Sequence, residues 1–167
     1  LRELRELPEI VGADDPDSQE LAKRLFKLLG NTKQILLTDS ASAEMAKLFS
    51  NVYRYVNFAL ANEFGILAEE LELDARHIID VANRGYKRGG IPMPGLSGGP
   101  CLYKDGHFLV SGLPFIDFIR AAWHLNESIP DYVISSVKAK HGSLYGKQIG
   151  VLGLAYKAGS DDVRYSP

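Results

Sequence analysis

Apolar residues recur at helical spacing over one long stretch of the chain. From Ser40 to about Leu71 they fall three and four positions apart, and no proline interrupts the run. Thr38, Asp39 and Ser40 offer N-cap oxygens at its start. The pattern therefore predicts a single helix of roughly thirty residues, which at 1.5 Å per residue would be about 45 Å long. Aromatic residues lie around much of it, so we expect neighbours on several sides, with a second subunit as one candidate: Phe49, Tyr53, Tyr55 and Phe58.

Shorter patterns on either side predict the remaining elements. Pro130 falls in the first turn of a helix predicted over residues 129–140, a position where proline is tolerated. Residues 9–12 and 34–39 are short apolar runs typical of extended segments, and residues 84–100, rich in glycine and proline, predict a loop. Helical spacing indicates four further helices, over residues 18–29, 74–83, 108–124 and 129–140.

The run GKQIGVLGLAYK, residues 146–157, is apolar and contains β-branched residues. It predicts the first strand of a Rossmann-like unit. Gly150 and Gly153 do not complete a GxGxxG fingerprint, so as a nucleotide-binding signal the run is weak. We therefore expect a mainly helical chain with one strand near its end.

Composition restricts the class of protein. The chain has 167 residues, of which 46% are hydrophobic and 24% charged, a balance typical of a globular protein with a core. Its formal net charge of −2 gives no electrostatic footprint for nucleic acid or an anionic membrane. No apolar run approaches the roughly 18 residues that span a bilayer. A single cysteine cannot form an internal disulfide, which favours a reducing, cytoplasmic setting.

That cysteine, Cys101, lies in the segment PMPGLSGGPCLYKDG, residues 92–106. Most free cysteines are small buried hydrophobes, which is the ordinary interpretation. Its neighbours favour a functional one, because the preceding Gly-Gly-Pro lets the backbone approach a ligand closely and offers N–H groups to an oxyanion or phosphate. Lys104 would favour the nucleophilic thiolate, and the Asp105 carboxylate could orient a water or act as a base.

Two further groups of polar residues are candidates for a site. Lys47 and Asn51 share one face of the long predicted helix and have apolar flanks, so they either form a solvated stripe or stabilise negative charge on a tetrahedral oxygen. The segment 155–167 is either an ordinary charged loop or an anion or cofactor contact, and includes Lys157, Asp161, Asp162 and Arg164. The four histidines show no metal-ligand spacing with Cys101, so we predict no metal site: His77, His107, His124 and His141.

Three segments, in this order, resemble motifs of the UDP-glucose/GDP-mannose dehydrogenase family of nucleotide-sugar 6-dehydrogenases. SAEMAKLFSNVYRYVNFALANEF resembles the family's central helix, and GLSGGPCLYKD its GGxCxxKD active-site loop. VLGLAYKAGSDDVRYSP resembles its LGxxFKxxTDDxRxSP segment, with Tyr156 in place of a common Phe. Pro100 and Gly106 are less usual in the cysteine loop. AEMAKL and ANEF are closer to the branch that includes UDP-N-acetylmannosamine dehydrogenase than to the UDP-glucose branch.

The resemblance implies a mainly α fold with a helical central dimerisation domain, followed by the first strand of a truncated Rossmann-like C-terminal domain. Residues 1–39 would be the tail end of an N-terminal NAD-binding domain, residues 40–143 the central domain with the cysteine loop, and residues 144–167 the start of the nucleotide-sugar-binding domain. The long helix would pair two subunits into a homodimer. Because most of both nucleotide-binding domains would lie outside this chain, we expect the chain alone to be an inactive fragment.

The resemblance also implies the chemistry. A UDP-sugar C6 alcohol would be oxidised to a carboxylate in two hydride transfers to NAD⁺, with Cys101 carrying a thiohemiacetal and then a thioester. Lys47 and Asn51 would hold the oxyanion and position the substrate, and Asp105 would assist water or thiol activation. Lys104 and Arg164 would contact NAD. The substrate contacts would be Gly90, Ile91, Pro92, Met93, Pro94, Gly98, Lys157 and Arg88, with Arg84 as the alternative to Arg88.

Two other interpretations remain open from the sequence. The chain could be a non-catalytic helical dimerisation module with a structural cysteine. It could also belong to a β-hydroxy-type dehydrogenase that shares the long dimer helix and needs no nucleophilic cysteine. Both interpretations predict that Cys101 has no part in catalysis.

Overall fold

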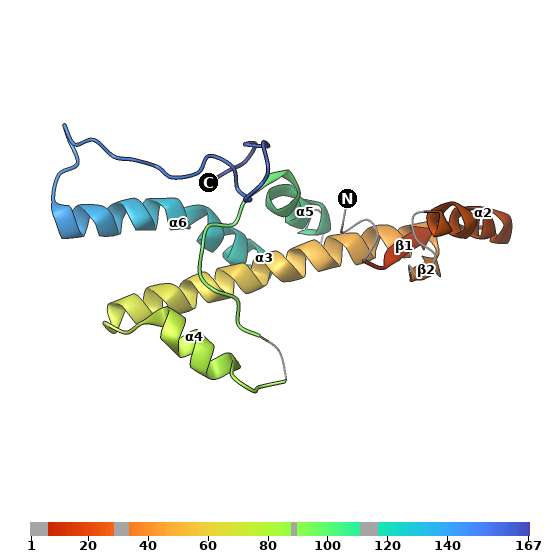
Figure 1. Cartoon of the computed structure of the whole chain (residues 1–167), viewed down its shortest axis with the longest axis horizontal. Helices are drawn as coiled ribbons and strands as arrows, with labels where there is room; N and C mark the ends of the chain where they lie inside the picture. Colours follow the sequence, from red (N-terminus) through yellow and green to blue (C-terminus); the bar gives the residue numbers. More distant parts are fainter. Residues whose placement is uncertain (1–6, 29–33, 88–89, 111–116) are drawn as a thin grey trace. The chain divides into compact units, whose positions relative to one another are not determined.

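The computed structural model describes residues 7–28, 34–87, 90–110 and 117–167, and these are mainly helical, as predicted (Figure 1). The described residues form two compact units, 1–50 and 51–167, and each is described by itself. None of the described helices is long and apolar enough to cross a membrane. In chain order the elements are β1 Glu9–Gly12, α2 Pro16–Lys27, β2 Ile35–Thr38, α3 Ser40–Glu70, α4 Ala75–Asn83, α5 Pro100–Val110 and α6 Asp117–His141.

The first unit contains a β-α-β arrangement. β1 and β2 are parallel and pair from Glu9 with Ile35 to Gly12 with Thr38, and α2 lies between them in the chain. The Asp15 carboxylate caps α2 by accepting the Ser18 N–H at 2.8 Å. Both short extended segments predicted from the sequence are therefore strands.

Gly12 ends β1 at a point where no side chain fits. A Cβ there would lie 2.8 Å from Ala43 Cβ and 2.8 Å from the Ser40 backbone. The Asp14 carboxylate accepts the Ser40 N–H at 2.9 Å, which joins the same strand end to the start of α3. The glycine thus permits a close approach of backbone to helix.

Helix α3 spans 31 residues, Ser40–Glu70, against the prediction of Ser40 to about Leu71. It ends where Glu72 adopts a left-handed φ of 56° and the Leu73 N–H bonds the Ala68 carbonyl at 2.8 Å. The Asp74 carboxylate then caps α4 through the Arg76 and His77 N–H groups. In the second unit the apolar core comes from α3, α4 and α6: Val52, Tyr55, Ala59, Ala61, Ala68, Ile79, Ala122 and Ile129.

The two helices predicted over 108–124 and 129–140 were wrong in their boundaries. Residues 117–141 form one helix, α6, with Pro130 inside it, and residues 108–110 belong to α5, while 111–116 lie outside the described residues. A proline inside a helix costs about 3 kcal/mol or more. The buried residues of α6, Ala122, Asn126 and Ile129, all precede Pro130. Beyond the proline, Tyr132 is half-buried and donates a hydrogen bond to Glu69 of α3, so the helix has contacts on both sides of Pro130.

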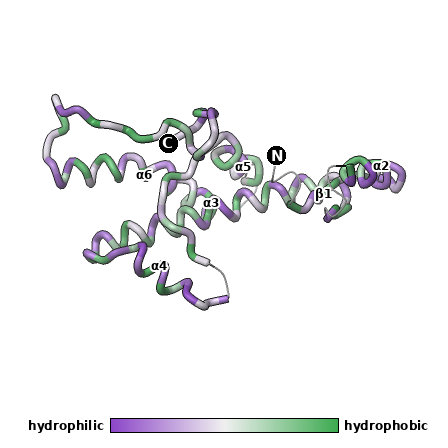
Figure 2. Tube along the Cα trace, viewed as in Figure 1, coloured by the Kyte–Doolittle hydropathy of each residue, from purple (hydrophilic) through white to green (hydrophobic). Residues whose placement is uncertain are grey.

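The strand predicted over residues 146–157 does not form. These residues have no regular secondary structure, and many are exposed, among them Leu152 at 99% and Val151 at 78%. Hydrophobic residues nevertheless mark much of this segment (Figure 2). A strand requires a neighbour that accepts its hydrogen bonds. In the described part of the chain the only sheet is β1–β2, so this segment has no such neighbour.

Candidate functional site

Helix α5 begins at Pro100 and carries the cysteine motif. The sequence predicted a loop over residues 84–100 and the next helix only from residue 108, but Pro100 and Cys101 are the first two residues of a helix. Its first turn leaves backbone N–H groups without helical partners and carries partial positive charge, which together favour an anion. Cys101 is exposed, and so is Lys104, one turn further along. An exposed thiol does not fit the interpretation of Cys101 as a small buried hydrophobe.

Asp105, four residues after Cys101, is held by Asn51 of α3. The Asn51 Nδ2 donates to the Asp105 Oδ2 at 2.5 Å, and the two residues are only 3% and 9% exposed. A buried carboxylate is costly without a donor, so this hydrogen bond stabilises Asp105 in place. The sequence assigned both residues to the site but did not predict that they touch each other. Lys47 lies one turn before Asn51 on α3 and is exposed.

The two glycines before Cys101 pack against the end of the chain. Gly99 has a φ of +98° and donates its N–H to the Tyr165 carbonyl at 2.9 Å. A Cβ on Gly99 would lie 2.8 Å from the Tyr156 ring, and one on Gly98 would lie 2.6 Å from the Tyr165 carbonyl oxygen. The segment that carries Lys157 and Arg164 is thereby placed against the cysteine motif. Tyr156 is a contact that the sequence did not predict.

Residues 90–95, which we call the proline loop, include most of the predicted substrate contacts. Gly90 and Met93 are exposed, whereas Pro92 and Pro94 are half-buried. Ile91 is bonded through its backbone to Asn83, with its N–H donating to Oδ1 at 2.8 Å and its carbonyl accepting from Nδ2 at 2.9 Å. Arg88, predicted as a substrate contact, lies outside the described residues, and its alternative Arg84 is exposed.

Two cavities are lined in part by this loop. One of about 390 Å³ is lined by residues of α3 and α4 together with Gly90, Ile91 and Pro92. A second of about 440 Å³ is lined by residues of α3, α4 and α6 together with Pro94, Gly95 and Leu96. The proline loop therefore lines two cavities in which small molecules could contact it.

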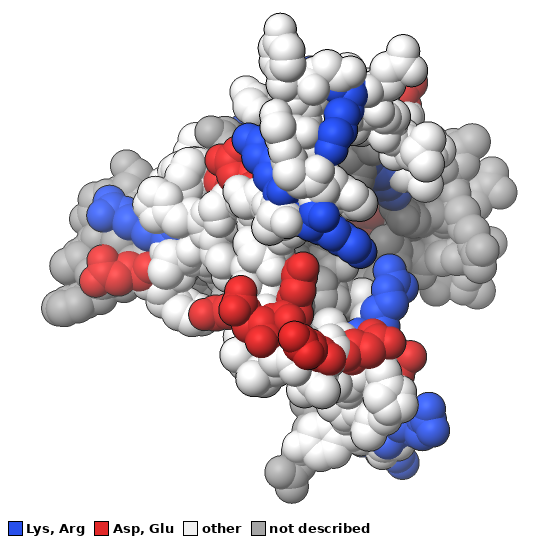
Figure 3. Space-filling model, turned by 90° about the vertical axis from the view of Figure 1, so that its left-hand side faces the viewer, with Lys and Arg blue, Asp and Glu red and all other residues white. Residues whose placement is uncertain are grey.

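The face of the molecule drawn in Figure 3 shows acidic side chains gathered together beneath Lys and Arg side chains. The α3–α4 junction contributes exposed acidic residues, and Tyr132 donates a hydrogen bond to one of them, Glu69, at 2.6 Å. This bond raises the pKa of the Tyr132 phenol, because it stabilises the protonated form. An anionic nucleotide is not expected to bind this acidic junction, whose members are Glu69, Glu70, Glu72 and Asp74.

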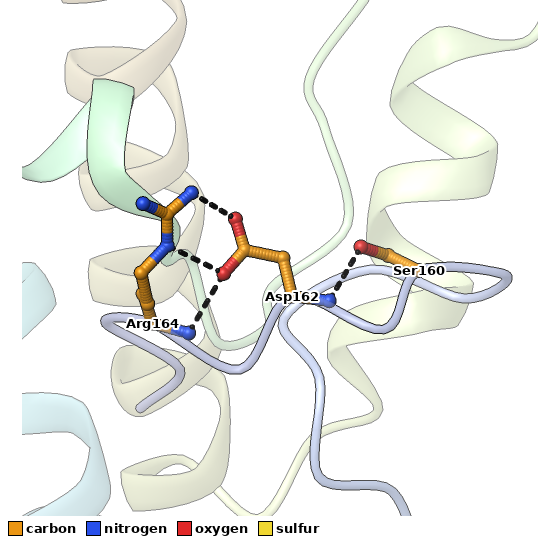
Figure 4. Close-up of polar contacts among 3 residues, drawn as sticks. All are labelled: Ser160, Asp162 and Arg164. Carbon is orange, nitrogen blue, oxygen red and sulfur yellow. Dashed lines mark hydrogen bonds and ion pairs between the residues drawn. The ribbon is translucent and has the colours of Figure 1, made fainter.

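Arg164, predicted to contact NAD, is held by Asp162 (Figure 4). The Arg164 Nε and Nη2 donate to the two Asp162 oxygens at 2.9 and 2.8 Å, and the Arg164 backbone N–H donates to Oδ1 at 3.1 Å. The Asp162 N–H in turn bonds the Ser160 hydroxyl at 3.2 Å. These bonds from Arg164 lower the pKa of Asp162 to about 2. The guanidinium is thus oriented before any ligand arrives.

We expect the ion pair between Asp162 and Arg164 to persist at acidic pH, down to about pH 2. The folded pKa of Asp162, about 2, lies below its ordinary value of 3.8, so its stabilising contribution is complete above the ordinary value and is lost as pH falls through about 2. An NMR titration of the Asp162 carboxyl carbon should show a midpoint near 2. In Arg164→Ala the midpoint should return towards 3.8, the ordinary value. A midpoint near 3.8 in the unaltered chain would contradict the pairing.

With this geometry described, comparisons with known proteins identify the family. The central-domain profile of the UDP-glucose/GDP-mannose dehydrogenase family matches residues 41–128. The chain belongs to this family. The resemblance seen in the sequence is therefore confirmed.

Several individual relatives are similar along the whole chain. It is 39% identical over 168 residues to a UDP-N-acetyl-D-mannosamine dehydrogenase of Methanocaldococcus jannaschii, covering all of this chain and 39% of that protein. It is 38% identical over 169 residues to an NDP-N-acetyl-D-galactosaminuronic acid dehydrogenase of Ralstonia nicotianae, covering all of this chain and 40% of that protein. The chain thus spans about two fifths of the length of these curated relatives.

Solved structures give the same family. A UDP-D-ManNAc dehydrogenase from Pyrococcus horikoshii matches with a TM-score of 0.85 and 34% identity, covering 99% of this chain and 40% of that one. A UDP-glucose dehydrogenase from Pyrobaculum islandicum matches with a TM-score of 0.87 and 30% identity, also over 99% of this chain and 40% of that one. The fold of the whole chain is therefore that of nucleotide-sugar dehydrogenases.

Proposed function

We propose that this chain is the central, cysteine-bearing part of an NAD-dependent nucleotide-sugar 6-dehydrogenase. The observation that carries the proposal is the exposed Cys101 at the start of α5, one turn from a carboxylate that Asn51 fixes. A nucleophile needs access to substrate, and a nearby group of fixed geometry that can manage protons or water. A structural cysteine in a dimerisation module needs neither.

Each part of the chain has a place in this proposal. Residues 1–39 belong to an NAD-binding domain, which the parallel β-α-β arrangement of residues 9–38 supports. Residues 40–143 are the central domain, and residues 144–167 begin the nucleotide-sugar-binding domain. An exposed apolar stripe along α3 supports a homodimer through that helix: Tyr53, Leu60, Phe64 and Leu67.

The Cys101 chemistry follows from the residues near it. After the C6 alcohol becomes an aldehyde, the Cys101 thiolate adds to its carbon, and the resulting oxyanion takes up a proton to give a thiohemiacetal. Removal of a second hydride from this carbon, together with loss of the hydroxyl proton, leaves a thioester. Water then cleaves the carbon–sulfur bond to give the carboxylate and the Cys101 thiolate, with release of two protons. Asp105 orients the water, and Asn51 with Lys47 stabilises the negative oxygen.

NAD would be held by exposed cations. Lys104 lies in the first turns of α5, and the Arg164 Nη1 is not among the guanidinium nitrogens that Asp162 binds, so both can face a pyrophosphate. When bound, NAD⁺ would accept one hydride in each of the two oxidations. The proline loop and Lys157 would contact the nucleotide sugar. Three of the four relatives named above carry the names of N-acetylated sugar nucleotides, and the fourth is a UDP-glucose dehydrogenase. We therefore propose a UDP-N-acetylhexosamine substrate.

The test measures how many NADH molecules form for each nucleotide sugar consumed. The full-length protein that contains this chain should form two NADH for each UDP-N-acetylmannosamine or UDP-N-acetylglucosamine consumed, with UDP-glucose as the comparison. Two NADH are expected because alcohol to acid is a four-electron oxidation. One NADH per sugar would mean that the reaction ends at the aldehyde, and none with any of the three sugars would leave the dimerisation module as the better interpretation.

A further inference from the structure

A chain of buried amide hydrogen bonds fixes one end of the proline loop. The Gly95 N–H donates to the Asn62 Oδ1 at 2.7 Å, and the Asn62 Nδ2 donates to the Asn126 Oδ1 at 3.1 Å. The Asn126 Nδ2 then donates to the Tyr55 carbonyl at 3.0 Å. Asn62 and Asn126 are each only 3% exposed. The loop is thereby connected to α3 and, through Asn126, to α6.

The direction of these bonds fixes the orientation of both amides. If the Asn62 amide were reversed, its NH₂ would face the Gly95 N–H and its oxygen would face the Asn126 oxygen. Buried amides without partners are costly, and a satisfied polar network selects one arrangement of the groups around it. The network therefore defines where Gly95 lies.

Two further contacts hold the loop before Gly95. Asn83, at the end of α4, bonds both backbone polar groups of Ile91, as a neighbouring strand would. Pro94 lies against Gly65 of α3, where a Cβ would come within 3.0 Å of the proline ring. The loop is therefore held at Ile91, Pro94 and Gly95, although it has no regular secondary structure.

We propose that Asn62, Asn126 and Asn83 are positioning residues for nucleotide-sugar binding. They hold the proline loop in the one backbone arrangement that receives the ligand, and they act through the loop rather than by touching the reacting carbon. A loop that is competent only part of the time binds more weakly in proportion to that fraction. The inference rests on the proposed function for its ligand, but not on Cys101 chemistry.

The experiment compares Asn83→Ala and Asn62→Ala with the unaltered full-length protein. Calorimetry with UDP-N-acetylmannosamine should show a dissociation constant raised about tenfold in each. Asn83→Ala removes two hydrogen bonds to the loop, and Asn62→Ala removes one to the loop and the one that joins Asn62 to Asn126. Hydrogen exchange at the Ile91 amide in Asn83→Ala, and at the Gly95 amide in Asn62→Ala, should become faster. Ser128→Ala is the matched control, because it removes a side-chain bond to a carbonyl within α6 and touches no part of the loop.

Steady-state kinetics distinguish a role in positioning the loop from a general loss of protein stability. KM should rise about tenfold, while kcat and the alkylation rate of Cys101 stay within about twofold, since Asn51 and Asp105 hold α5 independently. Equal losses in kcat and in thermal stability would overturn the inference, and so would faster exchange with unchanged affinity. Asn83 lies at a helix end and is half-buried, so its variant keeps the test valid if Asn62→Ala fails to fold.

An error in the proposed reaction can be distinguished from an error in the positioning inference. If the unaltered protein binds UDP-N-acetylmannosamine but forms no NADH, the reaction is wrong and the asparagines are still judged by the dissociation constants. If it binds none of the nucleotide sugars, the positioning inference is overturned together with the proposed function.

Discussion

Cys101→Ser in the full-length protein is expected to reduce formation of the sugar carboxylate by about 10³-fold or more, a loss typical of removing a catalytic nucleophile. A serine hydroxyl at neutral pH adds far more weakly to an aldehyde than a thiolate does. Since serine is close to cysteine in size and Cys101 is exposed, the fold should be unchanged. The measurement is chromatographic quantification of the uronate product, with NADH followed in parallel.

The aldehyde formed by the first oxidation allows a second measurement on Cys101→Ser. If Cys101 acts only after the first oxidation, Cys101→Ser should form at most one NADH per sugar, and an aldehyde-trapping amine should capture the product. Binding of the nucleotide sugar should stay within about twofold of the unaltered protein. Carboxylate formation at an undiminished rate would instead favour a β-hydroxy-type dehydrogenase, in which the long helix is shared but the thiol is not used.

The long helix could be predicted almost to its ends, because its evidence is local. Apolar residues at helical spacing, cap residues at Ser40 and the absence of proline are all properties of the sequence itself, and α3 runs as they indicate. Helix α4 followed from the Asp74 cap in the same way. Where the determining contacts are local, pattern and structure agree.

The errors occurred where distant contacts decide the structure. Pro130 would normally open a helix, yet α6 runs through it, with buried residues before the proline and a hydrogen bond from Tyr132 to Glu69 after it. The run 146–157 has the composition of a strand but no partner strand among the described residues. Pro100 was read as part of a loop, although proline is also favoured in the first helical turn and here opens α5.

The sequence named candidate site residues but not the contacts between them. Cys101 and Asp105 were selected because their neighbours in the sequence are chemically unusual. The partners that fix the site lie far along the chain: Asn62 and Asn126 are 64 residues apart, and Asn51 and Asp105 are 54 apart. A polar side chain on an apolar helix face signals a buried partner, but one sequence alone does not say which residue that partner is.

Gly99→Ala is expected to destabilise the second unit by about 2–5 kcal/mol, the largest stability effect that we predict for a single added methyl group. The left-handed φ of +98° costs an ordinary residue about 1–2 kcal/mol. Overpacking adds about 1–3 kcal/mol, because the new Cβ would lie 2.8 Å from the Tyr156 ring. Urea unfolding followed by circular dichroism measures the sum.

Two further variants separate these contributions. Gly142→Ala, at a φ of +72° with open space around its Cβ, should cost only the backbone part, about 1–2 kcal/mol. Adding Tyr156→Ala to Gly99→Ala should remove the overpacking but not the backbone cost, so the second substitution should destabilise less in this background than in the unaltered chain. Additive effects of the two substitutions would show that Tyr156 does not press on Gly99. Because Gly99 immediately precedes α5, relief of the clash by movement of this helix should also change the alkylation rate of Cys101. Such a change would link the end of the chain to the proposed nucleophile.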